Sequence, residues 1–312
     1  MIGLCPFHNE KTPSFSVSPS KGIYKCFGCG KAGNAVKFLM EHEQMSYPEA
    51  LRSLAERYNI EIPEEEKSEE AALAADHREK LFVIMQFAQR YFSQMLHESE
   101  EGKAIGLSYF KERDLRDSTI EAFQLGYSTE AWDGLLTAAK EAGYDPVDLV
   151  EVGLLRQKEE RYYDFFRDRV IFPIHNVTGK VIAFAGRTLK SDKKIPKYVN
   201  SPETVIYNKS QVLYGAFLAK AEMRKEDNCY IVEGYTDVIS LYQGGITNVV
   251  ASSGTSLTQE QVRLVRRYTR NITMLYDGDE AGIKAALRGV DLILEEDMNV
   301  RVVVLPDGED PD

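Results

Sequence analysis

Short apolar runs separated by helix-length segments make up the last third of the chain. Four runs have strand length and are rich in β-branched residues, at 229–232, 249–251, 271–276 and 300–305. Helical spacing follows the first run and returns between the third and fourth, at about 280–296. Strands that alternate with helices predict a parallel sheet, and such folds place ligands at the carboxyl ends of the strands.

Acidic residues come directly after several of these predicted strands. Carboxylates at neighbouring strand ends repel one another strongly unless a cation lies between them. Ligand sets made only of oxygen suit Mg²⁺ or Mn²⁺, so we predict a divalent-metal site at this edge. The alternative for each acidic residue is a cap on the following helix. The candidates are Glu233, Asp237, Asp277, Asp279 and Asp310, with Asp312 as a possible sixth.

Near the start of the chain, two pairs of metal-ligand residues each enclose two other residues. Cys5 and His8 form the first pair, and Cys26 and Cys29 form the second. Three cysteines and one histidine are a common tetrahedral zinc set, and four protein ligands leave no position for a reactive water. Alternating residues at 14–18 and 22–26 predict a hairpin between the pairs. We therefore expect a zinc ribbon that holds one structural Zn²⁺.

The middle of the chain changes pattern several times. The acidic stretch 63–80 predicts a flexible linker, and 81–96 predicts an amphipathic helix. Several short helices are expected from 104 to 154, with Trp132, the only tryptophan, in the core. Apolar runs at 167–174 and 181–187 then predict a second hairpin with basic residues at its ends.

Charge is distributed unevenly along the 312 residues. The chain carries a net charge of −11, but residues 155–225 hold 15 basic and 7 acidic side chains, and 226–312 hold 7 and 16. A basic segment before an acidic metal-site candidate favours a phosphate-bearing partner. No apolar run has the length of a membrane span and no signal-peptide pattern is present, so we expect a cytoplasmic protein without a membrane partner.

Several sequence motifs occur together and in one order. They are Thr12-Pro-Ser-Phe-Ser, Tyr24-Lys-Cys-Phe-Gly-Cys-Gly, Pro196-Lys-Tyr-Val-Asn-Ser-Pro-Glu, Glu233-Gly-Tyr-Thr-Asp, Asp277-Gly-Asp and Pro306-Asp-Gly-Glu-Asp-Pro-Asp. From Cys5 to Asp312 the chain resembles bacterial DnaG-type DNA primases, and its last third resembles their TOPRIM domain. The resemblance implies an α/β multidomain protein: a zinc ribbon at 1–62, the linker at 63–80, a mixed α+β basic subdomain at 81–227 and a TOPRIM domain with a parallel sheet at 228–312.

The resemblance also implies an enzyme, a DNA-directed RNA polymerase of the nucleotidyltransferase class that makes RNA primers for replication. It implies Mg²⁺ or Mn²⁺ held by Glu233, Asp277, Asp279 and Asp310, with Glu233 as an outer ligand or a proton acceptor. Basic and amide side chains would hold template, primer or triphosphate. They are Arg113, Arg167, Arg169, Arg187, Lys197, Asn200 and Lys209. The family usually has Gly where this chain has Asp114.

The partners implied are single-stranded DNA, ribonucleoside triphosphates and the RNA primer. The family's contact with the replicative helicase implies a carboxyl-terminal region beyond Asp312, and its usual start implies residues before Cys5. Two alternatives keep the same domains. A topoisomerase would need a nucleophilic tyrosine in a further domain, and a recombination-mediator clamp would bind DNA without polymerase activity.

Overall fold

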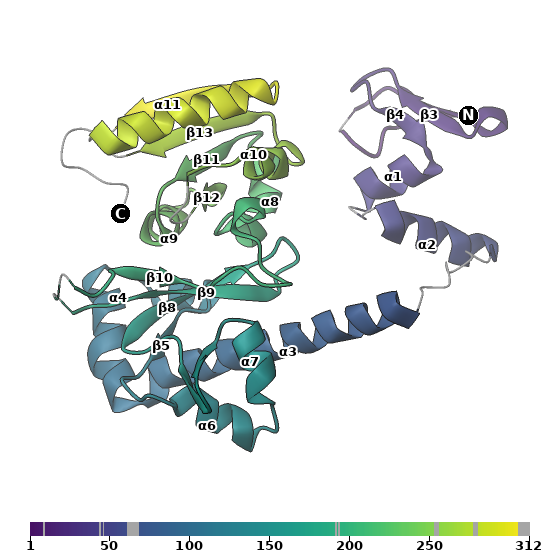
Figure 1. The fold of residues 1–312 in the computed structure, drawn as a ribbon. Helices are drawn as coiled ribbons and strands as arrows, with labels where there is room; N and C mark the ends of the chain where they lie inside the picture. The colour runs from purple at the N-terminus through teal and green to yellow at the C-terminus, as the bar shows by residue number, and fades with distance from the viewer. Residues whose placement is uncertain are drawn as a thin grey trace. The chain divides into compact units, whose positions relative to one another are not determined.

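A computed structural model describes residues 1–8, 10–43, 45, 47–60, 69–190, 192, 194–252, 256–276 and 280–304. The chain divides into two compact units, Met1–Ala72 and Leu73–Asp312, and each is described here by itself (Figure 1). No helix among the described residues is both long and apolar enough to cross a lipid bilayer.

The first unit is a four-stranded antiparallel sheet followed by two helices. The strands follow one another in space in the order β1-β2-β3-β4. The predicted hairpin is confirmed: β2 pairs with β3, and Gly22 at φ +62° closes the turn between them. The elements are β1 (Ile2–Gly3), β2 (Phe15–Ser18), η1 (Pro19–Lys21), β3 (Ile23–Cys26), β4 (Ala32–Asn34), α1 (Ala35–His42) and α2 (Tyr47–Tyr58).

The core of this unit is small and aromatic. Phe15 and Tyr24 are stacked at 5.2 Å across the hairpin, and Phe7 and Phe38 pack against them. So few apolar residues bury little surface, and domains of this size usually need a metal or disulfides for stability. We therefore expect the ribbon to need a metal bound at its cysteine and histidine ligands for stability.

The long helix α3 (Glu69–Glu98) corrects one prediction. The predicted helix at 81–96 is confirmed, but residues 69–80 belong to the same helix, so a flexible linker is wrong for that stretch. Alanine, leucine and glutamate there favour helix, and ion pairs from Lys80 to Asp148 and from His77 to Glu151 attach it to α7. Residues 61–68 lie outside the described residues.

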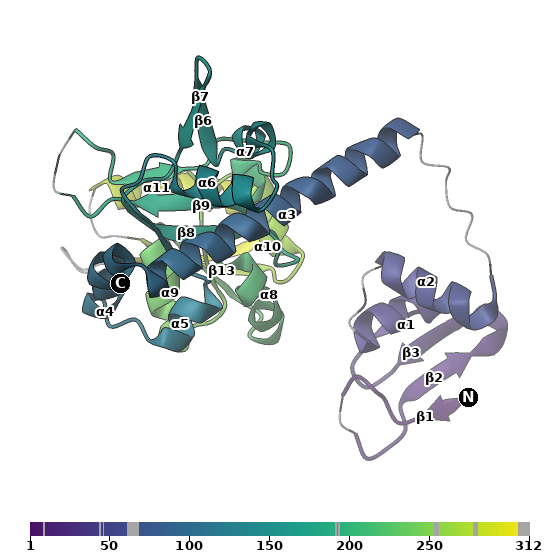
Figure 2. The same ribbon diagram turned by 90° about the horizontal axis from the view of Figure 1, so that it is seen from below.

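The basic subdomain packs an antiparallel sheet, in the order β10-β9-β8-β5, against α3 and several short helices (Figure 2). The predicted hairpin is β8 and β9, paired from Val170 to Arg187. The remaining elements are η2, which is π-helical (Gly102–Leu107), α4 (Ser108–Glu112), α5 (Asp117–Ala122), β5 (Gly126–Ser128), α6 (Gly134–Glu141), α7 (Pro146–Glu151), β6 (Leu155–Lys158), β7 (Arg161–Asp164), β8 (Arg169–His175), β9 (Val181–Arg187), β10 (Tyr198–Asn200) and η3 (Lys209–Gln211).

The last third forms the predicted parallel sheet, with strand order β12-β11-β13-β14. Side chains of β11 alternate between its two faces. Cys229 and Ile231 pack in the core of α8, α10 and α11, whereas Val232 packs with α9 and the basic subdomain. The elements are α8 (Ala216–Lys225), β11 (Cys229–Val232), α9 (Tyr235–Gln243), β12 (Val249–Ala251), α10 (Gln259–Arg266), β13 (Asn271–Tyr276), α11 (Glu280–Glu295) and β14 (Asn299–Val304).

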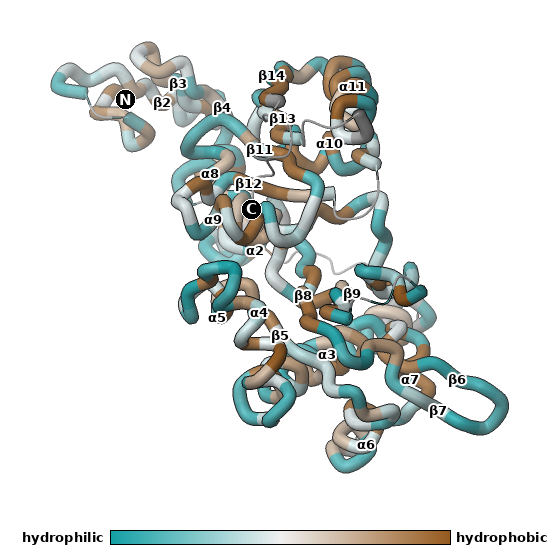
Figure 3. Tube along the Cα trace, turned by 90° about the vertical axis from the view of Figure 1, so that its left-hand side faces the viewer, coloured by the Kyte–Doolittle hydropathy of each residue, from teal (hydrophilic) through white to brown (hydrophobic). Residues whose placement is uncertain are grey.

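The basic subdomain and the parallel sheet share one hydrophobic core. Phe172 of β8 stacks on Tyr235 of α9 at 5.4 Å, and Tyr214 makes an antiparallel bridge with Ala251 at the free edge of β12. Figure 3 shows apolar residues along β8 and β13. The two sheets are therefore held together by buried contacts, which fixes side chains of one relative to the other.

Candidate functional site

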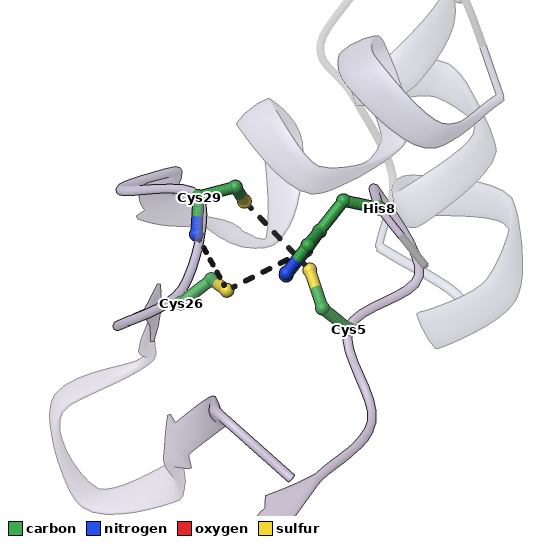
Figure 4. A group of neighbouring side chains, drawn as sticks. All are labelled: Cys5, His8, Cys26 and Cys29. Carbon is green, nitrogen blue, oxygen red and sulfur yellow. Dashed lines mark hydrogen bonds between the residues drawn. The ribbon is translucent and has the colours of Figure 1, made fainter. Parts of the chain in front are cut away.

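The four predicted zinc ligands lie together in the first unit (Figure 4). Cys5 and His8 come from the loop before β2, and Cys26 and Cys29 come from the end of β3 and the turn after it. Their ligand atoms all lie within 4.8 Å of one another. The hairpin thus brings the two pairs together as their spacing predicts.

The spacing of these atoms fits a tetrahedral metal. Cys5 Sγ lies 3.9 Å from Cys29 Sγ, and Cys26 Sγ lies 3.9 Å from His8 Nδ1. A tetrahedral zinc with Zn–S bonds of about 2.3 Å would separate its sulfur ligands by about 3.8 Å. The donor set and its dimensions therefore suit Zn²⁺, with His8 binding through Nδ1.

Glu10 supports this cluster, and the ligand spacing did not reveal it. Its Oε2 lies 3.3 Å from His8 Nε2, the ring nitrogen other than the Nδ1 that lies near Cys26. Its Oε1 accepts from the backbone N–H groups of Cys5 and Ser14, at 2.8 and 3.0 Å. The Ser14 hydroxyl donates a short hydrogen bond to Glu10 Oε2, and this bond is the largest cause of a lowered Glu10 pKa. A carboxylate on the second ring nitrogen orients a metal-binding histidine.

Cys26 is prepared to bind as a thiolate. Burial opposes its ionisation, but the Cys29 and Gly28 N–H groups donate to the sulfur, the Ser14 hydroxyl lies 3.2 Å from it, and the pKa falls to about 6. Burial next to the other thiols raises the pKa of Cys5 instead. The thiolate is the form of cysteine that binds a metal cation, so a bound cation would favour ionisation of both Cys26 and Cys5.

The second candidate site lies at the carboxyl edge of the parallel sheet. β11 ends at Val232 and its neighbour β13 ends at Tyr276, so Glu233 leaves the sheet at the edge where β13 also ends. Burial raises the pKa of Tyr276 to about 12, with the Glu233 charge as a further cause. Asp277, Asp279, Asp310 and Asp312 lie outside the described residues.

Asp237 shows the capping role that we considered as the alternative. It is buried in the first turn of α9, and its Oδ2 accepts from the Gly234 N–H at 2.8 Å. A carboxylate at this position is favoured by the helix dipole. Asp237 thus fixes the turn that follows Glu233.

Two arginines from the basic subdomain gather near Asp237. The guanidinium groups of Arg113 and Arg187 lie 5.4 and 4.8 Å from the ring centre of Tyr109. Burial raises the pKa of Tyr198; the positive charges of Arg187 and Arg113 lower it, and the negative charge of Asp237 raises it further. The Arg187 guanidinium lies 5.8 Å from the centre of the Tyr198 ring. Cations of one subdomain and a carboxylate of the other thus all act on the electrostatic environment of this tyrosine.

A cavity of about 520 Å³ opens beside this cluster. Arg187, Lys190 and Lys197 line it together with Tyr109. Among the described residues, the buried Nε of Arg187 has no hydrogen-bond partner. A buried donor without an acceptor is costly, and a phosphate oxygen would satisfy it.

Two arginines that the sequence suggested as phosphate-binding candidates have different contacts in the structure. Arg169 is buried and donates to the carbonyl oxygens of Gly186, Pro196 and Lys197, so its contacts are structural. Arg167 lies 3.4 Å above the ring of Trp132. Trp132 is 63% exposed, so its predicted place in the core is wrong. The presence of a single tryptophan in the sequence did not indicate that Arg167 would lie over its ring.

The remaining two candidates connect the subdomains. Asn200 Oδ1 accepts from the Tyr235 hydroxyl at 3.0 Å, which ties β10 to α9. Lys209 begins η3, and its backbone is bound to α10. Asp114, beside Arg113, has φ +56°, the conformation for which glycine is best suited.

Comparison with known families divides the chain as the motifs do. A CHC2 zinc finger family matches residues 1–70, a DNA primase catalytic core, N-terminal domain family matches 91–220, and a Toprim-like family matches 230–312. These matches cover the four zinc ligands, the arginines Arg113 and Arg187, and the acidic residues predicted at the carboxyl edge of the parallel sheet.

Individual relatives agree. A DNA primase of Halalkalibacterium halodurans is 45% identical over the whole chain, and this chain covers 51% of it. The zinc-binding and RNA polymerase domains of the Aquifex aeolicus primase superimpose with a TM-score of 0.70 and 38% identity, covering 99% of this chain and 73% of that one. A DnaG primase catalytic domain bound to ssDNA superimposes with a TM-score of 0.69 and 37% identity, covering 76% and 77%.

The chain spans about half the length of the curated relatives it matches. Over that span, the zinc ligands, the basic subdomain and the parallel sheet occur in the same order as in those relatives. The chain belongs to the bacterial DnaG-type DNA primase family.

Proposed function

We propose that this chain catalyses primer synthesis, the template-directed joining of ribonucleotides on single-stranded DNA. The observation that carries the proposal is the pair of arginines, Arg113 and Arg187, at the Tyr109 ring beside a cavity lined by basic side chains, on a chain whose parallel sheet places Glu233 at its carboxyl edge. Phosphoryl transfer needs little covalent chemistry from a protein and depends on positioned cations and electrostatic stabilisation.

The reaction is the attack of a primer 3′-hydroxyl on the α-phosphate of a ribonucleoside triphosphate, with pyrophosphate as the leaving group. Mg²⁺ or Mn²⁺, held by Asp277, Asp279 and Asp310 with Glu233 nearby, would lower the pKa of the hydroxyl and neutralise the charge on pyrophosphate. Asp237 holds the turn after Glu233, and Asp312 is a further candidate ligand.

Basic side chains of the other subdomain bind the substrate phosphates in this proposal. Arg187 and Lys197 line the same cavity, and among the described residues the buried Nε of Arg187 has no hydrogen-bond partner. Arg113 lies 5.4 Å from the centre of the Tyr109 ring, which Arg187 also contacts, and Lys209 is the first residue of η3. Arg169 acts indirectly, because it fixes the backbone at Lys197.

The template would contact exposed aromatic and cationic surfaces. Trp132 with Arg167 forms one such surface, and aromatic rings next to arginine suit stacked bases. In the zinc ribbon, Phe27 is 73% exposed, and Lys25 lies 5.2 Å from its ring centre. A related catalytic domain bound to ssDNA supports this partner. A contact with the replicative helicase stays a prediction.

The test is RNA synthesis by this chain on single-stranded DNA with ribonucleoside triphosphates and Mg²⁺. We expect Asp277→Ala to lower the rate by at least about 100-fold, the scale seen when a group that stabilises a transition state is removed. Asp291→Ala is the matched control, because Asp291 is an exposed aspartate on α11. DNA binding with no RNA from the unmodified chain would favour a clamp without polymerase activity.

A further inference from the structure

Gln261 is a fully buried polar residue whose side chain leaves its own helix to bind the backbone of the basic subdomain. It lies in α10 and is 0% exposed. Its Nε2 donates to the carbonyl oxygens of Lys209 and Val212, at 3.1 and 2.8 Å. Both amide hydrogens are therefore used on one short segment, η3 and the residue after it.

The same segment is also held by residues that precede it: the Lys209 N–H donates to Glu203 Oε1 at 3.2 Å, and the Ser210 N–H donates to Asn208 Oδ1 at 3.0 Å. η3 is only three residues long, and residues 209–212 belong to no sheet. Thr258, the N-cap of α10, donates its hydroxyl to the Ser210 carbonyl at 2.6 Å. The next residues are held at the bridge between Tyr214 and Ala251. α10 and β12 of the parallel sheet thus fix the segment that carries Lys209.

Gln261 also joins this segment to the loop that leaves the carboxyl edge of the sheet. Its Oε1 accepts from the Thr258 N–H at 3.1 Å, and the Thr258 hydroxyl accepts from the Gln261 N–H at 3.2 Å. This capping box begins α10 directly after the loop from β12. One side chain therefore binds both the start of α10 and the carbonyl oxygen of Lys209.

We propose that Gln261 is a positioning residue for nucleotide binding, acting through Lys209. The inference rests on the proposed function, in which Lys209 binds a phosphate of the ribonucleoside triphosphate. A lysine has a long, flexible side chain, so its backbone must be fixed for the ammonium group to reach one phosphate reliably. Gln261 supplies this restraint from the domain that carries the acidic edge.

The chemistry requires an amide at this position. Gln261→Glu keeps the acceptor for Thr258 but replaces both donors with a carboxylate that faces two carbonyl oxygens. Gln261→Met keeps the length and removes all three hydrogen bonds. Buried carbonyl oxygens left without donors would move toward water, and Lys209 would move with them.

The experiment is a double-mutant cycle on the affinity for Mg²⁺ and ATP, measured by calorimetry. Lys209→Ala should weaken binding by about tenfold, as expected for loss of one charge-assisted hydrogen bond. Gln261→Glu alone should weaken ATP binding to a similar extent. In a chain that already carries Lys209→Ala, Gln261→Glu should weaken ATP binding by less than about twofold. Such coupling would show that Gln261 acts through Lys209.

Asn248→Asp is the matched control. Asn248 is also buried, and its side-chain amide donates to the Asn228 carbonyl at 2.8 Å. It directly precedes β12, so it lies at the amino-terminal ends of the strands, away from the acidic residues. The control should destabilise the fold without changing the affinity for ATP. If Gln261→Glu does not fold, Gln261→Met replaces it in the cycle.

Two results would overturn the inference while leaving the proposed function intact. One is that the unmodified chain binds ATP and makes RNA, and the Gln261→Glu variant has the same affinity for ATP as the Asn248→Asp variant. The other is full additivity of the two substitutions. An unmodified chain that binds no ATP and makes no RNA would overturn the proposed function as well, so the two failures are distinguishable.

Discussion

At the scale of single residues, Glu10 connects the zinc ligands to the backbone that carries them. It contacts His8, Ser14 and the Cys5 N–H group. Glu10→Gln should weaken zinc binding by about 10- to 100-fold, as is typical for partners of metal-binding histidines. Competition with a chromophoric chelator measures the zinc affinity.

Glu43→Gln is the control, because Glu43 is exposed and its side chain contacts only His42 in the described contacts. Equal affinity of the two variants would contradict the role of Glu10.

His175 predicts how stability depends on pH. Burial lowers its pKa to about 4, its Nε2 lies 3.1 Å from Gln124 Oε1, which can only accept, and its ring stacks on Phe217. The unfolded chain therefore binds more protons than the folded one between about pH 6.5 and pH 4, so stability falls as the pH falls through this range. We expect His175 to contribute about 1–2 kcal/mol of loss between pH 7.5 and 5.

Denaturant unfolding at both pH values checks this prediction. His175→Gln should reduce the loss of stability on acidification, whereas exposed His97→Gln should leave it unchanged. An identical pH dependence in all three proteins would show that His175 does not titrate as described.

Residues whose chemistry depends on local spacing could be predicted from the sequence. The zinc ligands are the clearest case, because each pair is joined by two residues and the hairpin between them has a strong alternating pattern. The sequence did not reveal Glu10, it placed Trp132 in the core, and it did not show the carbonyl contacts of Arg169, because these roles depend on which distant side chain or carbonyl lies next to each residue. Trp132 is instead 63% exposed and lies under the guanidinium of Arg167.

At the scale of elements, α3 combines two environments in one helix. Leu81, Met85 and Phe92 are at most 1% exposed, whereas Leu73 is 70% exposed. An isolated helix of a dozen residues is only marginally stable in water, and exposed ion pairs add little. We therefore expect amide hydrogen exchange at residues 70–76 to be at least about 100-fold faster than at 84–96, measured by mass spectrometry. Equal protection along the helix would contradict this.

The elements with a clear period were predicted well, and the errors come from context. The apolar runs at 167–174 and 181–187 and those of the parallel sheet correspond to strands in the structure. The stretch 69–80 was assigned to a linker because of its charge, although its residues favour helix and α7 provides partners for Lys80 and His77. Composition alone does not show which charges will be paired.

At the scale of the whole molecule, side chains of the parallel sheet hold the loops of the basic subdomain. Gln243 of α9 binds the Asp114 carbonyl and the Arg116 N–H group, next to Arg113. Gln261 of α10 binds the backbone of Lys209. Since both loops carry candidate phosphate-binding residues, the domain that carries the acidic edge also orients the cations around it. The sequence indicated both sets of residues but not these contacts.

The central claim is that the acidic edge of this sheet binds a divalent metal. Titration with Mn²⁺ followed by electron paramagnetic resonance tests it directly, on the chain with its zinc site filled. We predict a Mn²⁺ site that Mg²⁺ displaces, that is lost in Asp277→Asn, and that remains in the exposed control Asp291→Asn. Unchanged Mn²⁺ binding in Asp277→Asn, or no binding by the unmodified chain, would contradict the account.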